Sequence, residues 1–239
     1  MRTKSMILLA ITLMGLIGLS SCEKINGKGE VVTEYRTVTG FAGIDLAIDG
    51  KVYYTQGPDY SLMVEAQENL MRYIQTFVDD GRLVIREKPG MSLGKHEPII
   101  FRITAPSVSG IWISGSGNFY VLNTWTGENL EAGISGSGKI SITSLDTRSI
   151  QVRISGSGDL TVSGGFADSE HLQISGSGNV DLRQVISIYT SATISGSGDI
   201  YTQVSDLLDA TIAGSGSIYY LGQPVIKAHI SGSGKVVKL

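Results

Sequence analysis

Acidic and aromatic residues recur at fixed offsets behind a repeated Ser-Gly-Ser-Gly motif, and these are the residues that could do chemistry. Three consecutive copies are followed directly by Asp, Asn and Asp. Four copies carry Asp or Tyr two residues further on, on the same outer face: Tyr120, Asp181, Tyr201 and Tyr219. Carboxylates beside an aromatic shelf can hold Ca²⁺ or the face of a sugar, and a carboxylate pair can serve a glycosidase. The candidate binding face therefore comprises Asp159, Asn179, Asp181, Asp199, Tyr201 and Tyr219.

The other patterns that could carry chemistry are weaker. Residues 133–140 approach a phosphate-binding P-loop, but they lack the Ser or Thr that would hold Mg²⁺ and no helical pattern follows. The histidines His96, His171 and His229 stand far apart in the sequence, which favours solvated surface side chains over a zinc site or a catalytic triad. We therefore expect no metal, no cofactor and no catalytic residues.

The repeat that positions the candidate face has a nearly constant period. Ile-Ser-Gly-Ser-Gly begins at Ile113, and copies follow at intervals of 18 to 21 residues, one of them with Ala213 in place of the first Ser. Such a period is typical of a solenoid, in which each repeat forms one coil. The starting residues of the seven copies are Ile113, Ile134, Ile154, Ile174, Ile194, Ile212 and Ile230.

Apolar residues alternate on both sides of each motif, as in Val152/Ile154 before it and Leu160/Val162 after it. A period of two indicates two half-buried strands per repeat, because a helix would need a period of 3.6. We predict an all-β fold, a parallel two-sheet β-helix of about 20-residue coils stacked about 4.8 Å apart. One larger apolar residue in each connecting loop should close the coil: Leu145, Phe166, Val185, Leu207 and Val225.

The glycines of the motif are expected to be structural. A tight turn between two sheets favours positive φ, which glycine adopts at low cost, and a Cβ there would meet the neighbouring coils. The predicted turn residues are Gly115, Gly117, Gly136, Gly138, Gly156, Gly158, Gly176, Gly178, Gly196, Gly198, Gly214, Gly216, Gly232 and Gly234.

Coil stacking also bears on the candidate face. Asp159 and Asp199 would lie two coils apart, about 10 Å, slightly beyond the carboxylate separation of about 6.5–9.5 Å in inverting glycosidases. The structural alternative is that mixed polar residues keep an outer face soluble, with Asn179 separating two acids. Lys139 next to Asp159 is the one basic–acidic neighbour pair that we expect in the repeats, and such a pair is typical of a surface ion pair.

Residues 31–110 contain no copy of the motif. Strand-like runs lie at 31–38, 44–48, 52–55, 61–65, 83–86 and 99–104, and a short helix is compatible with residues 67–76. Because an open solenoid end exposes unpaired strand edges, we expect this strand-rich part to cap residues 111–239 within one continuous domain.

The first 21 residues form an export signal. Arg2 and Lys4 precede an uncharged run from Met6 to Leu19, which is shorter than the roughly 20 apolar residues of a membrane-spanning helix. The following Leu-Ser-Ser-Cys resembles the lipobox of bacterial lipoproteins, which implies cleavage before Cys22 and lipid attachment there. Residues 22–30 are then a tether, and we expect the exported protein in the cell envelope, at the outer membrane of a Gram-negative bacterium.

Composition excludes two further classes of protein. The 239 residues carry a net charge of −3, so the chain has no electrostatic footprint for nucleic acid. A single cysteine excludes a disulfide framework.

The N-terminal phrases and the serial Gly-Ser-Gly turns together resemble the putative auto-transporter adhesin, head GIN domain family. The phrases are residues 41–46 (Phe-Ala-Gly-Ile-Asp-Leu), 52–57 (Val-Tyr-Tyr-Thr-Gln-Gly) and 80–85 (Asp-Gly-Arg-Leu-Val-Ile). The resemblance implies a two-sheet β-helix with a shape similar to pectin lyases, an adhesive role, and no catalytic residues. The lipid-anchor signal departs from an autotransporter, which carries its own membrane barrel.

Three hypotheses about function remain open at this point. The first is a lipid-tethered, non-enzymatic module that binds a glycan or a host or envelope protein, and this is the one we favour. The second is a carbohydrate-active β-helix enzyme, and the third is a periplasmic envelope scaffold without a specific ligand. Fold analogy does not choose between them, and the oligomeric state is not predicted.

Overall fold

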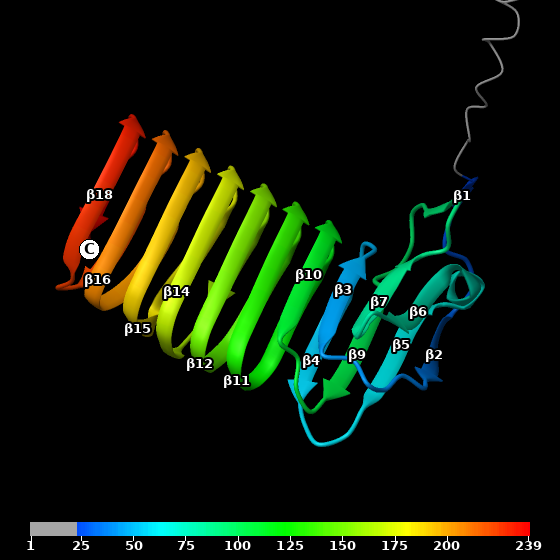
Figure 1. Cartoon of the computed structure of the whole chain (residues 1–239). Coiled ribbons are helices and arrows are strands. Elements are labelled where there is room, and N and C mark those ends of the chain that lie inside the picture. The colour runs from blue at the N-terminus through cyan, green and yellow to red at the C-terminus, as the bar shows by residue number, and fades with distance from the viewer. Residues whose placement is uncertain (1–22) are drawn as a thin grey trace, which may run out of the picture.

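The structure, a computed structural model, describes residues 23–239 as a straight rod of stacked coils with a strand-rich cap at one end (Figure 1). The expected parallel β-helix is confirmed. The expected signal peptide and the lipid-attachment residue Cys22 lie outside the described residues. Within residues 23–239, the structure holds no helix with the length and hydropathy that crossing a bilayer would require.

Each repeat forms one coil, and the motif residues of successive coils lie in register. Ile113 pairs with Ile134, and Ile134 with Ile154, in parallel ladders that continue to Ile230. The coil strands are β10 (Gly110–Gly115), β11 (Asn118–Gly136), β12 (Lys139–Gly156), β13 (Asp159–Val162), β14 (Gly165–Gly176), β15 (Asn179–Gly196), β16 (Ile200–Gly214), β17 (Ile218–Gly222), β18 (Val225–Gly232) and β19 (Val236–Lys238).

Most of the connector backbone continues the hydrogen-bonded ladder instead of forming loops, although the register shifts between Val121 and Thr124 and between Leu182 and Ile186. Within the connectors, the strands are interrupted only at residues 163–164 and 223–224. One inward column of the connectors contains Trp125, Leu145, Gly165 and Val185. Phe166 is 40% exposed and Val225 is 65% exposed. Leu207 pairs with Val225, and its neighbour Leu208 is the buried residue of that connector. The expectation that these three residues, Phe166, Leu207 and Val225, close their coils is therefore wrong. Register sets which side chains point inward, and it places Gly165 at the inward position and Phe166 outside.

The motif glycines stand where a side chain would break the stack. The first glycine of each pair has positive φ, as at Gly176 with φ +139°. A Cβ at Gly176 would meet the carbonyl oxygen of Gly156 in the preceding coil, whereas Gly178 lacks a positive φ but approaches Gly158 equally closely. Glycine is therefore needed for backbone conformation at the first position and for close approach at both.

The solenoid begins inside the N-terminal part of the chain. Strands β3 (Gly43–Ala47) and β4 (Lys51–Gln56) pair in parallel with β10 and β11, and they form a coil whose turn contains Asp49 and Gly50. Strands β7 (Arg82–Glu87) and β9 (Ile100–Ala105) pair with β3 and β4 as a further layer. The boundary expected at residue 110 therefore marks where the motif starts and not where coil stacking starts.

Antiparallel strands end the stack. Strand β5 (Ser61–Gln67) runs antiparallel to β9, β6 (Ile74–Asp79) to β7, and β2 (Val31–Arg36) to β5. The helix considered at 67–76 is a 3-10 helix, η1 (Glu68–Tyr73), and the chain turns into β6 at Ile74. The apolar residues at helical spacing are buried, but they belong to two different elements: Leu70 to η1 and Ile74 to β6. The predicted capping role of residues 31–110 thus belongs mainly to β2, β5, β6 and η1.

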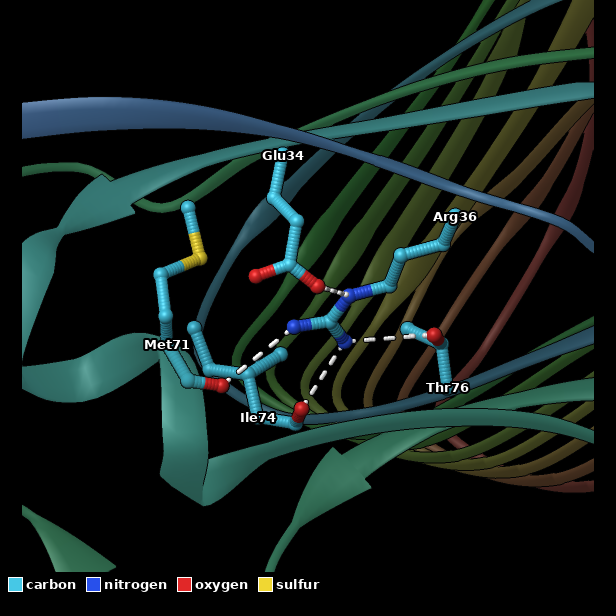
Figure 2. A network of polar contacts seen from close by, with 5 residues as sticks. All are labelled: Glu34, Arg36, Met71, Ile74 and Thr76. Atoms are coloured by element: carbon cyan, nitrogen blue, oxygen red, sulfur yellow. Dashed lines mark hydrogen bonds and ion pairs between the residues drawn. The ribbon is translucent and has the colours of Figure 1, made fainter.

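Arg36 fastens the cap (Figure 2). Its guanidinium group donates to the carbonyl oxygens of Met71 (3.3 Å) and Ile74 (2.8 Å) and to Thr76 Oγ1 (3.2 Å), and its Nε lies 2.8 Å from Glu34 Oε1. These contacts join β2 to η1 and β6. Strand β2 itself pairs with β5 and not with β6.

Residues 23–30 dock on the cap. Strand β1 (Glu23–Ile25) pairs in parallel with β8 (Met91–Leu93). Asn26 Oδ1 accepts from the Lys95 amide at 2.9 Å, and the Lys28 amide donates to Asn69 Oδ1 at 2.7 Å. The expectation of a free tether is therefore wrong for these residues, because their backbone groups find partners on the cap.

Candidate functional site

One outward column runs along the strand segments that follow the turns, and it carries half of the predicted face. We call the surface along this column the after-turn face. Strand pairing places Asp181 between Thr161 and Tyr201 and continues to Tyr219. In the opposite direction the same column continues through the cap-proximal coils. Its members in spatial order are Arg102, Tyr53, Tyr120, Ser141, Thr161, Asp181, Tyr201 and Tyr219.

The residues directly after the motif form a hydrogen-bonded ladder instead of an open acidic patch. Asp159 Oδ1 accepts from the Asn179 amide at 3.2 Å and from Asn179 Nδ2 at 2.9 Å. Asn179 Oδ1 in turn accepts from the Asp199 amide at 3.1 Å, and Asp199 Oδ1 from the Ser217 amide at 2.8 Å. Each side chain thus satisfies a backbone group at the start of the next coil, which gives these residues a structural use.

Asp181 is engaged differently, by an arginine two residues along its own strand. Arg183 Nη2 lies 2.6 Å from Asp181 Oδ2, and Arg183 Nε lies 2.9 Å from Oδ1. The hydrogen bonds from Arg183 hold the pKa of Asp181 below its ordinary value. Sequence reasoning missed Arg183, although alternation along a strand places residues i and i+2 on one face.

The structure stacks Tyr201 on Tyr219. Their ring centroids are 4.7 Å apart with an angle of 10° between the ring planes. Arg183 Cζ lies 4.6 Å from the Tyr201 centroid, a cation–π distance. Desolvation, followed by the nearby Asp199 charge, raises the pKa of the Tyr201 hydroxyl above its ordinary value.

A second cluster of the same composition lies toward the cap. Tyr53 and Tyr120 stack with centroids 5.1 Å apart and an angle of 16° between planes. Arg102 Cζ lies 5.4 Å from the Tyr53 centroid, and Arg102 Nε is 3.0 Å from Glu65 Oε1. Sequence reasoning placed Tyr120 on the outer face but did not connect it to Tyr53, because β4 carries no copy of the motif.

The metal-ligating residue types do not gather at one place between residues 23 and 239. This part of the chain holds no cluster of three or more His, Cys, Asp or Glu that could bind a metal ion. Lys139 and Asp159 do not form the expected ion pair within the described structure. Arg153 instead pairs with Glu131 of the neighbouring coil at 2.7 Å.

Glu170 is an ionisable side chain buried inside the rod. Its Oε2 accepts from Thr190 Oγ1 at 2.8 Å and from Thr202 Oγ1 at 2.6 Å. Its Oε1 has no hydrogen-bond partner among the described residues. Burial raises the pKa of Glu170 to about 7, and the two threonine hydrogen bonds oppose that shift.

The fold and the turn motif together define a parallel β-solenoid. A family model described as "Putative auto-transporter adhesin, head GIN domain" matches residues 40–224. The chain belongs to this family. The family description connects it with adhesins and hence with the cell surface or envelope.

Solved structures agree with this assignment. A putative adhesin from Bacteroides fragilis shares 28% identity, with a TM-score of 0.85 over 90% of this chain and 100% of that chain. A putative lipid binding protein from Parabacteroides distasonis shares 23% identity, with a TM-score of 0.75 over 91% of this chain and 100% of that one. The second similarity supports the fold alone. No curated protein matches the chain.

Proposed function

We propose that the chain is a lipid-anchored, non-enzymatic, adhesin-like binding module of the cell envelope. The observation that carries the proposal is that the acidic side chains on and beside the after-turn face are already bonded within the fold. The carboxylates of the predicted face are bonded within the fold: Asp159 and Asp199 to backbone amides of the next coil, and Asp181 to Arg183. What the face offers to another molecule is a pair of tyrosine stacks on a rigid ladder.

The docked N-terminus supports a definite orientation. Glu23, which follows the proposed acylated Cys22, begins β1 on the cap. Lipid attached at residue 22 would therefore hold the cap end at the bilayer, and the repeats would extend from the cap away from β1 (Figure 1). A di- or triacyl anchor carries more than one chain, which suffices for stable attachment. The repeats would then present the after-turn face to molecules beyond the membrane.

Metabolic labelling with an alkynyl palmitate tests the anchor. Cells expressing the full-length protein should incorporate the label and retain the protein in the membrane fraction. The Cys22→Ser variant should lose both, whereas Ser21→Thr, which keeps the cysteine, should retain both. Equal labelling of wild type and Cys22→Ser would refute acylation at Cys22.

A further inference from the structure

The after-turn face contains a gap in its column of large side chains. Between Tyr120 and Asp181 the column holds only Ser141 and Thr161. Neighbouring strands lie about 4.8 Å apart, so Tyr120 and Asp181, three strands apart, are separated by about 14 Å along the rod. The short side chains between them form the floor of a slot, which we define by Tyr120, Ser141, Thr161, Asp181 and Arg183.

One end of the slot is an aromatic wall. Tyr53 covers one face of the Tyr120 ring, with nearly parallel planes and centroids 5.1 Å apart. The opposite face of Tyr120 is directed along the column toward Ser141, whose side chain is too small to cover it. Tyr53 therefore fixes the orientation of the Tyr120 ring, which leaves one face available for stacking by a ligand.

The other end of the slot is a polar wall. Arg183 and Asp181 form a bidentate pair, and their side chains remain 43% and 28% exposed. Tyr201 packs against the guanidinium group and holds it in place. A hollow of about 360 Å³ lies beside this wall and outside the slot; Leu221 and Leu239 line it together with Thr161, Ser163, Asp181 and Arg183.

We propose that this slot binds a neutral saccharide, an inference that rests on the proposed binding function and names its ligand class. The apolar C–H face of a sugar ring would stack on Tyr120, and its hydroxyl groups would bond to Ser141, Thr161, Asp181 and the remaining Arg183 donors. Because Asp181 and Arg183 neutralise each other, the slot selects no charged ligand. The floor of the slot itself, Ser141 and Thr161, provides no apolar anchor for a protein partner, and Leu221 and Leu239 lie outside it in the neighbouring hollow.

Saturation-transfer NMR on the detergent-solubilised full-length protein tests the proposal. The probes are cellotetraose, xylotetraose, chitotetraose and maltotetraose. We expect saturation transfer to the ring protons of at least one probe. Tyr120→Ala should weaken its binding about tenfold, the size of one lost stacking contact. Tyr189→Ala is the matched control, because Tyr189 is 49% exposed and lies outside the slot, and it should bind as the wild type does.

A second substitution blocks the slot without removing a contact. Ser141→Tyr would continue the tyrosine stack from Tyr120 and occupy the space of the ligand, so binding should disappear while the melting temperature stays unchanged.

Two results would overturn the saccharide assignment: absence of transfer to all probes, or binding that Ser141→Tyr leaves intact. Neither result affects palmitate labelling, so failure of the saccharide assignment is distinguishable from failure of the proposed anchoring.

Discussion

Replacing Glu170 by Gln should stabilise the protein above neutral pH, because the substitution removes a carboxyl group that the fold buries completely. Glu170 has no exposed surface, and its hydrogen bonds come from the hydroxyl groups of Thr190 and Thr202. Gln has nearly the same shape and retains an oxygen that can accept from both threonines. The change therefore removes the charge with little disturbance to packing.

The expected magnitude follows from the shift in pKa. Burial moves the pKa of Glu170 from 4.5 to about 7 in the folded protein. A folded state with the higher pKa binds the proton more tightly, so the free energy of unfolding falls as the pH rises from the unfolded pKa through the folded one. Each pKa unit corresponds to about 1.4 kcal/mol, so about 3 kcal/mol should be lost by about pH 8.

Denaturant unfolding across this pH range is the assay. From about pH 5 to about pH 8 the wild type should lose stability relative to Glu170→Gln, with the difference approaching about 3 kcal/mol at the upper end. Glu128→Gln is the control, because Glu128 is 69% exposed in its ion pair and should contribute little at any pH. If the difference between wild type and Glu170→Gln is independent of pH, the buried carboxyl does not titrate as argued.

Three further predictions concern the turns, the ladder and the cap. Gly176→Val should lower the melting temperature severely, because its side chain would meet the Gly156 carbonyl in a positive-φ position; an unchanged melting temperature contradicts the stacked-turn account. Asn179→Asp should destabilise by about 1 kcal/mol at neutral pH, since it replaces the bond to Asp159 with repulsion; urea titrations should show partial recovery in high salt. Arg36→Met should speed amide hydrogen exchange in β6 with little change in the central coils, because it removes the contacts that hold β2 to η1 and β6. Exchange rates in β6 equal to those of the wild type would contradict this prediction.

The sequence predicted the repeating part of the fold because one strong constraint recurs in every coil. The motif fixes the turn, and alternation outward from it fixes which side chains face inward, as for Ile154 and Leu160. The sequence did not indicate that β3 and β4 form a coil of the solenoid, because their turn contains Asp49 and Gly50 instead of the motif. Only the pairing with β10 and β11 shows that they form a coil.

The errors within the repeats arose where hydrophobicity and register disagree. Phe166 was expected inside because it is apolar, whereas pairing with Leu145 places Gly165 there. Alternation back from Ile174 and Leu172 leads inward to Glu170, but the polar residue at that position was not considered for the core. The position of Arg183 beside Asp181 could also have been predicted, because alternation along a strand places residues i and i+2 on the same face. Docking of residues 23–30 could not have been predicted, because it depends on long-range partners such as Asn69 and Lys95.

Surface labelling of intact cells tests the central proposal most directly, because an adhesin-like role requires that the lipid-anchored rod be presented outside the cell. Cys22 is the only cysteine, so an introduced Asp146→Cys at an exposed site in the middle of the rod would provide a single free thiol once Cys22 is acylated. A membrane-impermeant maleimide should label this thiol in intact cells while a periplasmic cysteine protein stays unlabelled. Labelling only after the outer membrane is opened would contradict presentation at the surface and would favour a periplasmic envelope scaffold.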